Sequence, residues 1–393
     1  MAVILGSKPS LPTTQFVIGT SKTFTAPLTG RIKVVITGGG GQGAFLANSN
    51  STAKDNLGSG TGGGAGGYCE KTFAVTAGET FTITIGAGGA TALGPNNITT
   101  SRAGSGGSNS SFVTASAAVS VNMVANGGGG GQYGAGTSSA ITVAGGTGGT
   151  ASGGDFNYTG GAGGSVTRVA GNGSSCVVTG GGAVAIYGTA YRGGNISVTD
   201  ALGDVYYAGA SGAGGVGGNG GDLTITTSGV TTGTIKPIFI SDGGSSSMAG
   251  ASYQGASSAY FDGVYTSGAP TGSSTINQLD AQGDGGPSVY YTGGSALNAY
   301  SGGYGGGSGG AVHTPDGPYY HNHYPGGGFG GGGASSYILG SGDYNGSTPV
   351  RAGPGGVGGG GSGAWNGRFS QMTSASGREW APGGDGVCII MFV

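Results

Sequence analysis

The chain has 393 residues, of which 102 are glycine and only 7% are charged, and its formal net charge is −2. Full disorder usually combines low hydropathy with a high net charge, whereas this chain has a mean hydropathy of +0.02. The near-neutral charge argues against a nucleic-acid partner, and no stretch approaches the roughly 20 apolar residues of a membrane-spanning helix.

The chain begins MAVILGSKPSLP, in which Ala2–Leu5 is too short for the apolar core of a secretion signal. We therefore expect synthesis in a cytosol, and we assign residues 1–22 to an N-terminal arm that makes an assembly contact. The cysteines Cys69, Cys176 and Cys388 are few and far apart, so they do not predict a disulfide framework.

The clearest strand signals lie in the first third of the chain. Ile32, Val34 and Ile36 predict a mostly buried strand within Thr23–Thr37. The segment YCEKTFAVTAGETFTITIGAGG predicts strands Glu70–Val75 and Thr80–Ile85 on either side of a hairpin-like turn at Ala77–Gly78. Further short strands are expected within residues 104–113 and 119–126.

The glycine run Gly38–Gly43, GGGGQG, formally matches the dinucleotide-binding fingerprint GxGxxG after a strand. No helix pattern follows it, because the next residues break into Asn and Ser, and no second βα unit supplies an acidic residue. In a chain so rich in glycine, such a match is expected by chance.

A period of three residues dominates the glycine-rich region, most clearly in Gly209–Asp222, GASGAGGVGGNGGD. This period fits neither an α-helix nor a strand, but it matches the left-handed polyproline II helix. Such a helix has no internal hydrogen bonds, so its backbone groups must pair with neighbours. We therefore expect a bundle of polyglycine II helices with Gly215, Gly218 and Gly221 facing neighbouring helices; the alternative is a flexible glycine-rich linker.

Tyr, Ser, Gly and Asn dominate three segments of the middle region, at residues 253–265, 289–304 and 313–329. This composition is typical of adaptable recognition loops, in which tyrosine offers a large contact area with few rotatable bonds. The alternative is that these side chains cover the edges of the bundle. The candidate receptor-binding residues are Tyr253, Tyr260, Tyr265, Tyr290, Tyr291, Tyr300, Tyr319, Tyr320 and Tyr324.

The last segment, GGDGVCIIMFV at residues 383–393, is so apolar that it predicts a buried strand beside the first one. The predicted fold is therefore all-β: a β-sandwich frame from both chain ends, an inserted bundle of polyglycine II helices, and Tyr-rich loops. The expected divisions are the arm at 1–22, the frame at 23–126, the bundle with its loops at 127–382, and the closing strand at 383–393.

The order FTAPLTGRIKVVITGGGGQG, GGGAGGYCEKTFAVTAGETFTITIGAGG, GGSNSSF, NGGGGG and GGDGVCIIMFV resembles the glycine-rich domain of phage tail-fibre and tail-tip adhesins. A related glycine-rich region occurs in receptors of the anaplastic-lymphoma-kinase type. The resemblance implies a β-sandwich that carries a lattice of polyglycine II helices. The absence of a kinase or membrane-span pattern favours the phage-like interpretation.

All three histidines lie within residues 313–323. In an extended segment His321 and His323 point to the same side, so the pair can hold a metal. In a trimer, three copies of this pair around the three-fold axis would supply six histidine nitrogens. The resemblance to tail fibres supports this interpretation, because tail-fibre shafts use such sites. The alternative is an exposed aromatic-rich loop that contains histidine by chance. The sequence predicts no cofactor.

The sequence gives little support to an enzyme. Gly306–Gly310 matches GxSxG, but no apolar strand leads into it, and the metal-hydrolase and phosphate-loop motifs are absent. The expected function is host attachment by a virion protein of the tail fibre or tail tip, made in the host cytoplasm. Its expected partners are other tail proteins, further copies in a homo-oligomer (a trimer), and a host-surface polysaccharide or outer-membrane protein.

Two other functions remain open at this point. One is a purely structural virion or filament protein that binds only its own copies. The other is an ice-binding bundle, against which the bulky tyrosines count.

Overall fold

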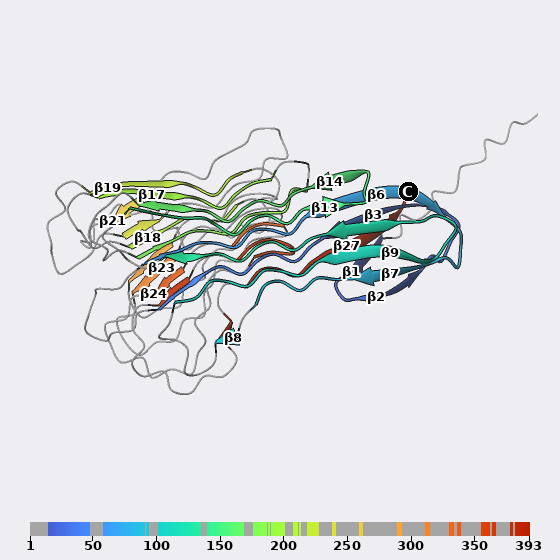
Figure 1. Ribbon diagram of the computed structural model, residues 1–393, viewed down its shortest axis with the longest axis horizontal. Coiled ribbons are helices and arrows are strands. Elements are labelled where there is room, and N and C mark those ends of the chain that lie inside the picture. Colours follow the sequence, from blue (N-terminus) through green and yellow to red (C-terminus); the bar gives the residue numbers. More distant parts are fainter. Residues whose placement is uncertain are drawn as a thin grey trace, which may run out of the picture.

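The computed structural model describes a set of residues that covers the β framework and much of the glycine-rich region. These are residues 15–47, 58–90, 92–93, 101–134, 140–168, 176–186, 188, 190–200, 207–210, 212–213, 218–227, 238–240, 259–261, 289–292, 311–314, 330–333, 336–338, 355–361, 364–366, 378–379 and 382–393. The described part is all-β, as the sequence predicts, and contains strands joined by extended glycine-rich segments (Figure 1).

Two five-stranded sheets form a sandwich at one end of the molecule. The first sheet has the order β1-β27-β3-β6-β14, with β1 Gln15–Ile18, β27 Val387–Phe392, β3 Gly30–Thr37, β6 Tyr68–Val75 and β14 Phe156–Tyr158. The second has the order β13-β10-β9-β7-β2, with β13 Ala151–Ser152, β10 Asn122–Ala125, β9 Ser110–Ser116, β7 Thr80–Thr84 and β2 Lys22–Thr25.

The two ends of the chain meet in the first sheet. β27 lies between β1 and β3, and it pairs antiparallel with β3 from Val387 opposite Thr37 to Phe392 opposite Ile32. Ile32, Ile36 and Ile390 are fully buried. The predicted pairing of the first long strand with the closing strand is confirmed, whereas the expected division boundaries remain predictions.

The sandwich core lies between the sheets and combines aliphatic side chains with a cluster of aromatic rings. Phe81 on β7 stacks on Phe112 of β9 with ring centroids 4.9 Å apart, and Phe73 on β6 packs edge-on against both rings. Burial raises the pKa of the Cys69 thiol to about 11 and that of Cys388 to about 12, so both remain neutral thiols in this core.

The predicted hairpin at Ala77–Gly78 is wrong, although the turn itself is present. β6 belongs to the first sheet and β7 to the second, so the turn crosses from one sheet to the other. Gly78 has a φ of +92°, which favours glycine. The physical reason is that Phe73 and Phe81 face each other across the core instead of lying side by side in one sheet.

Short strands form three sheets at the opposite end of the molecule (Figure 1). One has the order β11-β5-β16-β18-β20-β21, with β11 Tyr133–Gly134, β5 Ser59–Gly60, β16 Cys176–Val178, β18 Tyr207–Gly209, β20 Ile238–Ile240 and β21 Ala259–Phe261. Another has the order β12-β15-β17-β19, with β12 Ile141–Val143, β15 Val166–Arg168, β17 Ile196–Asp200 and β19 Leu223–Thr227.

The third distal sheet is parallel throughout and has the order β22-β23-β24-β25-β4. Its strands are β22 Val289–Thr292, β23 Ala311–Thr314, β24 Ser336–Ile338, β25 Ala364–Asn366 and β4 Phe45–Ala47. A separate pair joins β26 Arg378–Glu379 to β8 Ala92–Leu93. Glycine-rich segments span the distance between the sandwich and these sheets (Figure 1).

Candidate functional site

The glycine-rich segments form a laterally hydrogen-bonded bundle, and residues 62–67 lie at its centre. The N–H groups of Gly63 and Gly66 donate to the carbonyls of Gly361 and Gly358 at 2.7 and 2.8 Å. The next N–H groups, those of Gly64 and Gly67, donate to residues 129 and 126 instead, at 2.9 Å each. Every third donor therefore points to the same neighbour, as expected of a helix with three residues per turn.

Burial repeats with the same period on a segment at the bundle surface. Along residues 144–150, Ala144, Thr147 and Thr150 are exposed, whereas Gly146 and Gly149 are buried. The buried glycines donate to the carbonyls of residues 62 and 65 at 2.9 and 2.8 Å. The flexible-linker alternative is therefore wrong for the described segments, and the predicted polyglycine II bundle is present.

Backbones approach so closely in this bundle that a glycine facing a neighbouring segment leaves no room for a side chain. A Cβ atom on Gly41 would overlap the carbonyl of Gly129, and one on Gly64 would overlap the carbonyl of Thr147. Gly41 belongs to the run GGGGQG, so this match to the dinucleotide fingerprint is a bundle segment that continues from β3. Glycine is required here because neighbouring backbones must come within hydrogen-bonding distance.

The stretch Gly209–Asp222 is described only in part. Gly215 lies outside the described residues, whereas Gly218 and Gly221 are buried. Gly220 between them donates its N–H to the carbonyl of Arg192 at 2.9 Å. The described part of this stretch is therefore hydrogen-bonded laterally, and the effect of a side chain at Gly218 or Gly221 remains a prediction.

Polar side chains complete the hydrogen bonding where a glycine-rich segment lacks a backbone partner. The Asp385 carboxylate accepts the N–H of Gly88 at 2.8 Å, and the Asn109 amide oxygen accepts that of Gly127 at 3.0 Å. In the interior, the Thr179 hydroxyl accepts the N–H of Gly62 at 3.1 Å and donates to the carbonyl of Gly164 at 2.6 Å. For the buried N–H of Gly62, the loss of such an acceptor would be costly.

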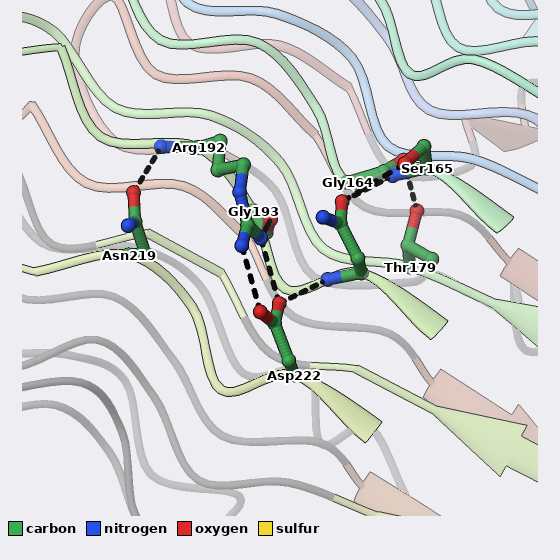
Figure 2. A network of polar contacts seen from close by, with 8 residues as sticks. Gly164, Ser165, Thr179, Arg192, Gly193, Asn219 and Asp222 are labelled. Carbon is green, nitrogen blue, oxygen red and sulfur yellow. Dashed lines mark hydrogen bonds and ion pairs between the residues drawn. The ribbon is translucent and has the colours of Figure 1, made fainter. Parts of the chain in front are cut away.

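One network of this kind marks the passage from the bundle into the distal sheet of β15, β17 and β19 (Figure 2). Ser165, Asn195 and Asp222 each follow two glycines and immediately precede one of these strands. The Asn195 side-chain oxygen accepts the N–H of Ser165 at 2.8 Å. The Asp222 carboxylate accepts the N–H of Asn195 at 2.7 Å. We call these three residues the strand-entry ladder.

An ion pair closes the ladder at its outer end. Arg192 binds the Asp222 carboxylate through both terminal nitrogens of its guanidinium group, at 2.6 and 2.7 Å (Figure 2). The backbone N–H of Arg192 donates to the side-chain oxygen of Asn219 at 3.0 Å. Burial alone would raise the pKa of Asp222, but the hydrogen bonds from Arg192 and the Asn195 N–H outweigh it and lower the pKa. The bond to Asp222 raises the pKa of Arg192.

Sequence reasoning missed this network, although a local signal exists. The triplets Gly163–Ser165, Gly193–Asn195 and Gly220–Asp222 share the form Gly-Gly followed by Ser, Asn or Asp, and an aliphatic residue comes next in each case. A small polar acceptor at this position fits a side chain that hydrogen-bonds to a neighbouring backbone. The repeated pattern therefore indicates where polyglycine helices change into parallel strands.

Most of the predicted tyrosine sites lie outside the described residues, namely Tyr253, Tyr265, Tyr300, Tyr319, Tyr320 and Tyr324. Tyr260 belongs to β21, and Tyr290 and Tyr291 belong to β22. The structure brings β21 and the sheet that contains β22 to the distal end of the molecule (Figure 1). Their role in receptor binding stays a prediction.

The predicted metal pair His321 and His323 also lies outside the described residues, whereas His313 is part of β23. Within the described ranges, no three His, Cys, Asp or Glu side chains gather in a metal-binding group. The part of the chain that the structure describes contains no helix long and apolar enough to cross a membrane.

The described residues thus define a glycine-rich β protein, in which a two-sheet sandwich continues into a polyglycine bundle. The model of the Glycine-rich domain family matches residues 13–215, which is more than half of the chain, and the chain belongs to this family. A comparison with curated proteins finds no match. β27, which completes the first sheet of the sandwich, lies beyond the matched residues.

Proposed function

We propose that this protein is a phage virion protein of the tail fibre or tail tip, and that it attaches the particle to the host surface. The observation that carries the proposal is the separation of two ends. β1 and β27 lie together in the sandwich, whereas β21 and β23 lie at the far end of the bundle (Figure 1). The sandwich is the end that joins other tail proteins, and the distal end is the one that meets the host.

The bundle suits the role of a rigid mount. Residues 62–67 are hydrogen-bonded to several neighbouring segments, and a bundle linked in this way resists bending more than a single extended chain. Function placed on loops that a rigid scaffold presents is a common arrangement. The protein needs no catalytic activity for this role, and it would be made in the host cytoplasm before it joins the virion.

The receptor class follows from the composition of the three Tyr-rich segments. They contain only two acidic residues, Asp262 and Asp316, and no lysine or arginine. Binding therefore rests on aromatic contacts and hydrogen bonds, which suits a polysaccharide or the loops of an outer-membrane protein. Because few charges take part, adsorption to cells should depend weakly on salt.

Replacement of Tyr319, Tyr320 and Tyr324 together by Ser tests the proposal. We expect far-UV circular dichroism and the melting temperature to stay unchanged, while adsorption of particles to cells falls. A matched control replaces Tyr133, a half-exposed tyrosine of β11, by Ser. Normal adsorption by a correctly assembled triple mutant would remove this segment from the binding site. A particle structure with many copies along a shaft or coat would favour the purely structural alternative.

A further inference from the structure

The outward face of the first sheet carries apolar side chains where a solvent-exposed sheet face usually carries polar ones. One row runs across all five strands: Val17, Ile389, Val35, Glu70 and Phe156 are successive partners in register. The next row toward the bundle ends with Tyr68 opposite Tyr158, and the next one away from it contains Met391 and Lys33. We call these side chains the outer face.

The apolar character of the outer face is clearest in β27, because this strand is apolar on both of its faces. Cys388 and Ile390 point into the sandwich core and are fully buried. Ile389 and Met391 point outward and remain half-buried. A strand that is apolar on both faces is typical of a sheet that is covered on both sides.

The residues that the structure describes cover only part of this face. Val184 and Ile186 pack against Val35 and Tyr68 and form a small second core beside the bundle. At the two edges of the sheet, Val17 is 65% exposed and Phe156 is 53% exposed. Val17 continues the apolar row through Ile389, and Phe156 lies beside Tyr158 with ring centroids 6.4 Å apart. Aromatic side chains and methionine are enriched at protein interfaces.

The charges of the face suit contact with an identical copy. Lys33 and Glu70 are the charged residues of these three rows, and they form an ion pair at 2.6 Å in which Glu70 also accepts the Tyr68 hydroxyl at 2.8 Å. The pair has no net charge, so the three rows do not repel their own copy. A surface of one dominant sign would favour an oppositely charged partner instead.

We propose that a second copy of this chain packs on the outer face, with a rotation axis that runs along the strands. Such an axis keeps the two copies at the same height and brings the β1 edge of one copy to the β14 edge of the next. Val17 then contacts Phe156 of the neighbouring copy. Since the strands run along the length of the molecule (Figure 1), the distal ends of all copies point in the same direction.

A disulfide test identifies this contact directly. Within one copy, Val17 and Phe156 are four strand spacings apart, about 19 Å, whereas a disulfide needs Cα atoms within about 7 Å. The full-length double variant Val17→Cys with Phe156→Cys should therefore form covalent dimers or trimers under mild oxidation. Each single variant should stay uncrosslinked, which also controls for the native cysteines.

Sedimentation equilibrium of the unmodified full-length chain gives an independent test. We expect a dimer or a trimer, weakened about tenfold or more by Val17→Lys. The control Val119→Lys changes a valine that is 38% exposed in the turn between β9 and β10, and it should leave the assembly unchanged. A monomeric wild-type chain, equal weakening by both lysine variants, or no cross-link in the double variant would overturn the proposal.

Discussion

In the sandwich, fully buried side chains such as Phe81, Phe112 and Met123 fill the space between two sheets, whereas in the bundle the buried atoms belong largely to the backbone. The sandwich is stabilised by removal of apolar surface from water, roughly 25 cal/mol per Å². The bundle relies on many backbone hydrogen bonds, each with a net contribution of only about 0.5–1.5 kcal/mol.

This difference implies that the bundle depends on the sandwich. Glycine loses more conformational freedom on folding than any other residue. An isolated glycine-rich segment is therefore disfavoured by conformational entropy unless its backbone hydrogen bonds are held in place. The sandwich strands are continuous with bundle segments: β3 leads into residues 38–44, and residues 61–67 lead into β6. The sheets thereby fix the positions and directions from which the polyglycine helices start.

Deletion of the last seven residues, 387–393, should have the largest effect. It removes β27 from the middle of the first sheet, leaving β1 without its partner and exposing one edge of β3. We expect no soluble folded protein, and because the bundle depends on the sandwich, its hydrogen-bonded backbone should become open to amide exchange as well. Soluble yield and amide hydrogen exchange measure this. Unchanged melting of the truncated chain would contradict the predicted dependence.

A side chain at a central glycine should disrupt the bundle nearly as severely. Gly64→Val places its Cβ against the carbonyl of Thr147, so two backbones that hydrogen-bond must separate. We expect a loss of at least about 3–4 kcal/mol in the free energy of unfolding, or misfolding. Gly218→Val, at a buried position in the Gly209–Asp222 stretch, should act in the same direction.

The matched control for these variants is Ala162→Ser, which enlarges an exposed side chain on a bundle surface segment. It should change the free energy of unfolding, measured by denaturant titration, by less than about 0.5 kcal/mol. Equal tolerance of Gly64→Val and Ala162→Ser would mean that the bundle is loosely packed, against the contacts described above.

Phe81→Ala should destabilise the sandwich by about 3–5 kcal/mol, because it leaves a cavity beside Phe73 and Phe112. Phe156→Ala removes the same atoms from an exposed site, and at concentrations too low for copies to associate it should cost much less. Together with the glycine variants, the pair sharpens the contrast: the sandwich is sensitive to loss of side-chain volume, the bundle to its gain. Similar losses in both phenylalanine variants would refute that account.

The sequence predicts both the β-sandwich and the polyglycine II bundle, and each prediction has a physical reason. Alternation in β3 and the apolar closing strand follow from burial, and the period of three follows from the geometry of polyglycine II. The hairpin at Ala77–Gly78 was wrong because local alternation does not reveal which sheet a strand joins. The period of three is the same in every glycine-rich segment, so it does not predict that residues 62–67 lie at the centre of the bundle.

The candidate site was less predictable than the fold. The strand-entry ladder depends on residues about 30 positions apart, as in the Asn195 to Asp222 contact, and their meeting depends on how the helices pack. The outer face depends likewise on strand order, since Val17, Ile389 and Phe156 share a row only after β27 pairs with both β1 and β3. The sequence pattern alone does not supply that order.

The smallest predicted effect separates charge from hydrogen bonding in the strand-entry ladder. Asp222→Asn keeps an oxygen that can accept the Asn195 N–H but removes the charge that binds Arg192. For a pair as exposed as this one, we expect a loss of about 0.2–1 kcal/mol. Asp222→Ala removes both interactions and should cost about 1–2 kcal/mol, since a backbone donor also loses its acceptor. Denaturant titration of the three proteins measures both differences.

The pH dependence gives this prediction a second measurement. The pKa of Asp222 is lowered in the folded protein, so the ionised carboxylate stabilises the fold at pH values above the ordinary aspartate pKa of about 3.9. That contribution is lost as the pH falls through the lowered pKa, because protonation removes the charge that Arg192 binds. The stability difference between wild type and Asp222→Asn should therefore be constant near neutral pH and shrink in acid.

Other carboxylates titrate equally in both proteins, so their contributions cancel in this difference. A difference that stays constant down to strongly acidic pH would mean that the ion pair with Arg192 contributes nothing, and that the ladder rests on its hydrogen bonds alone.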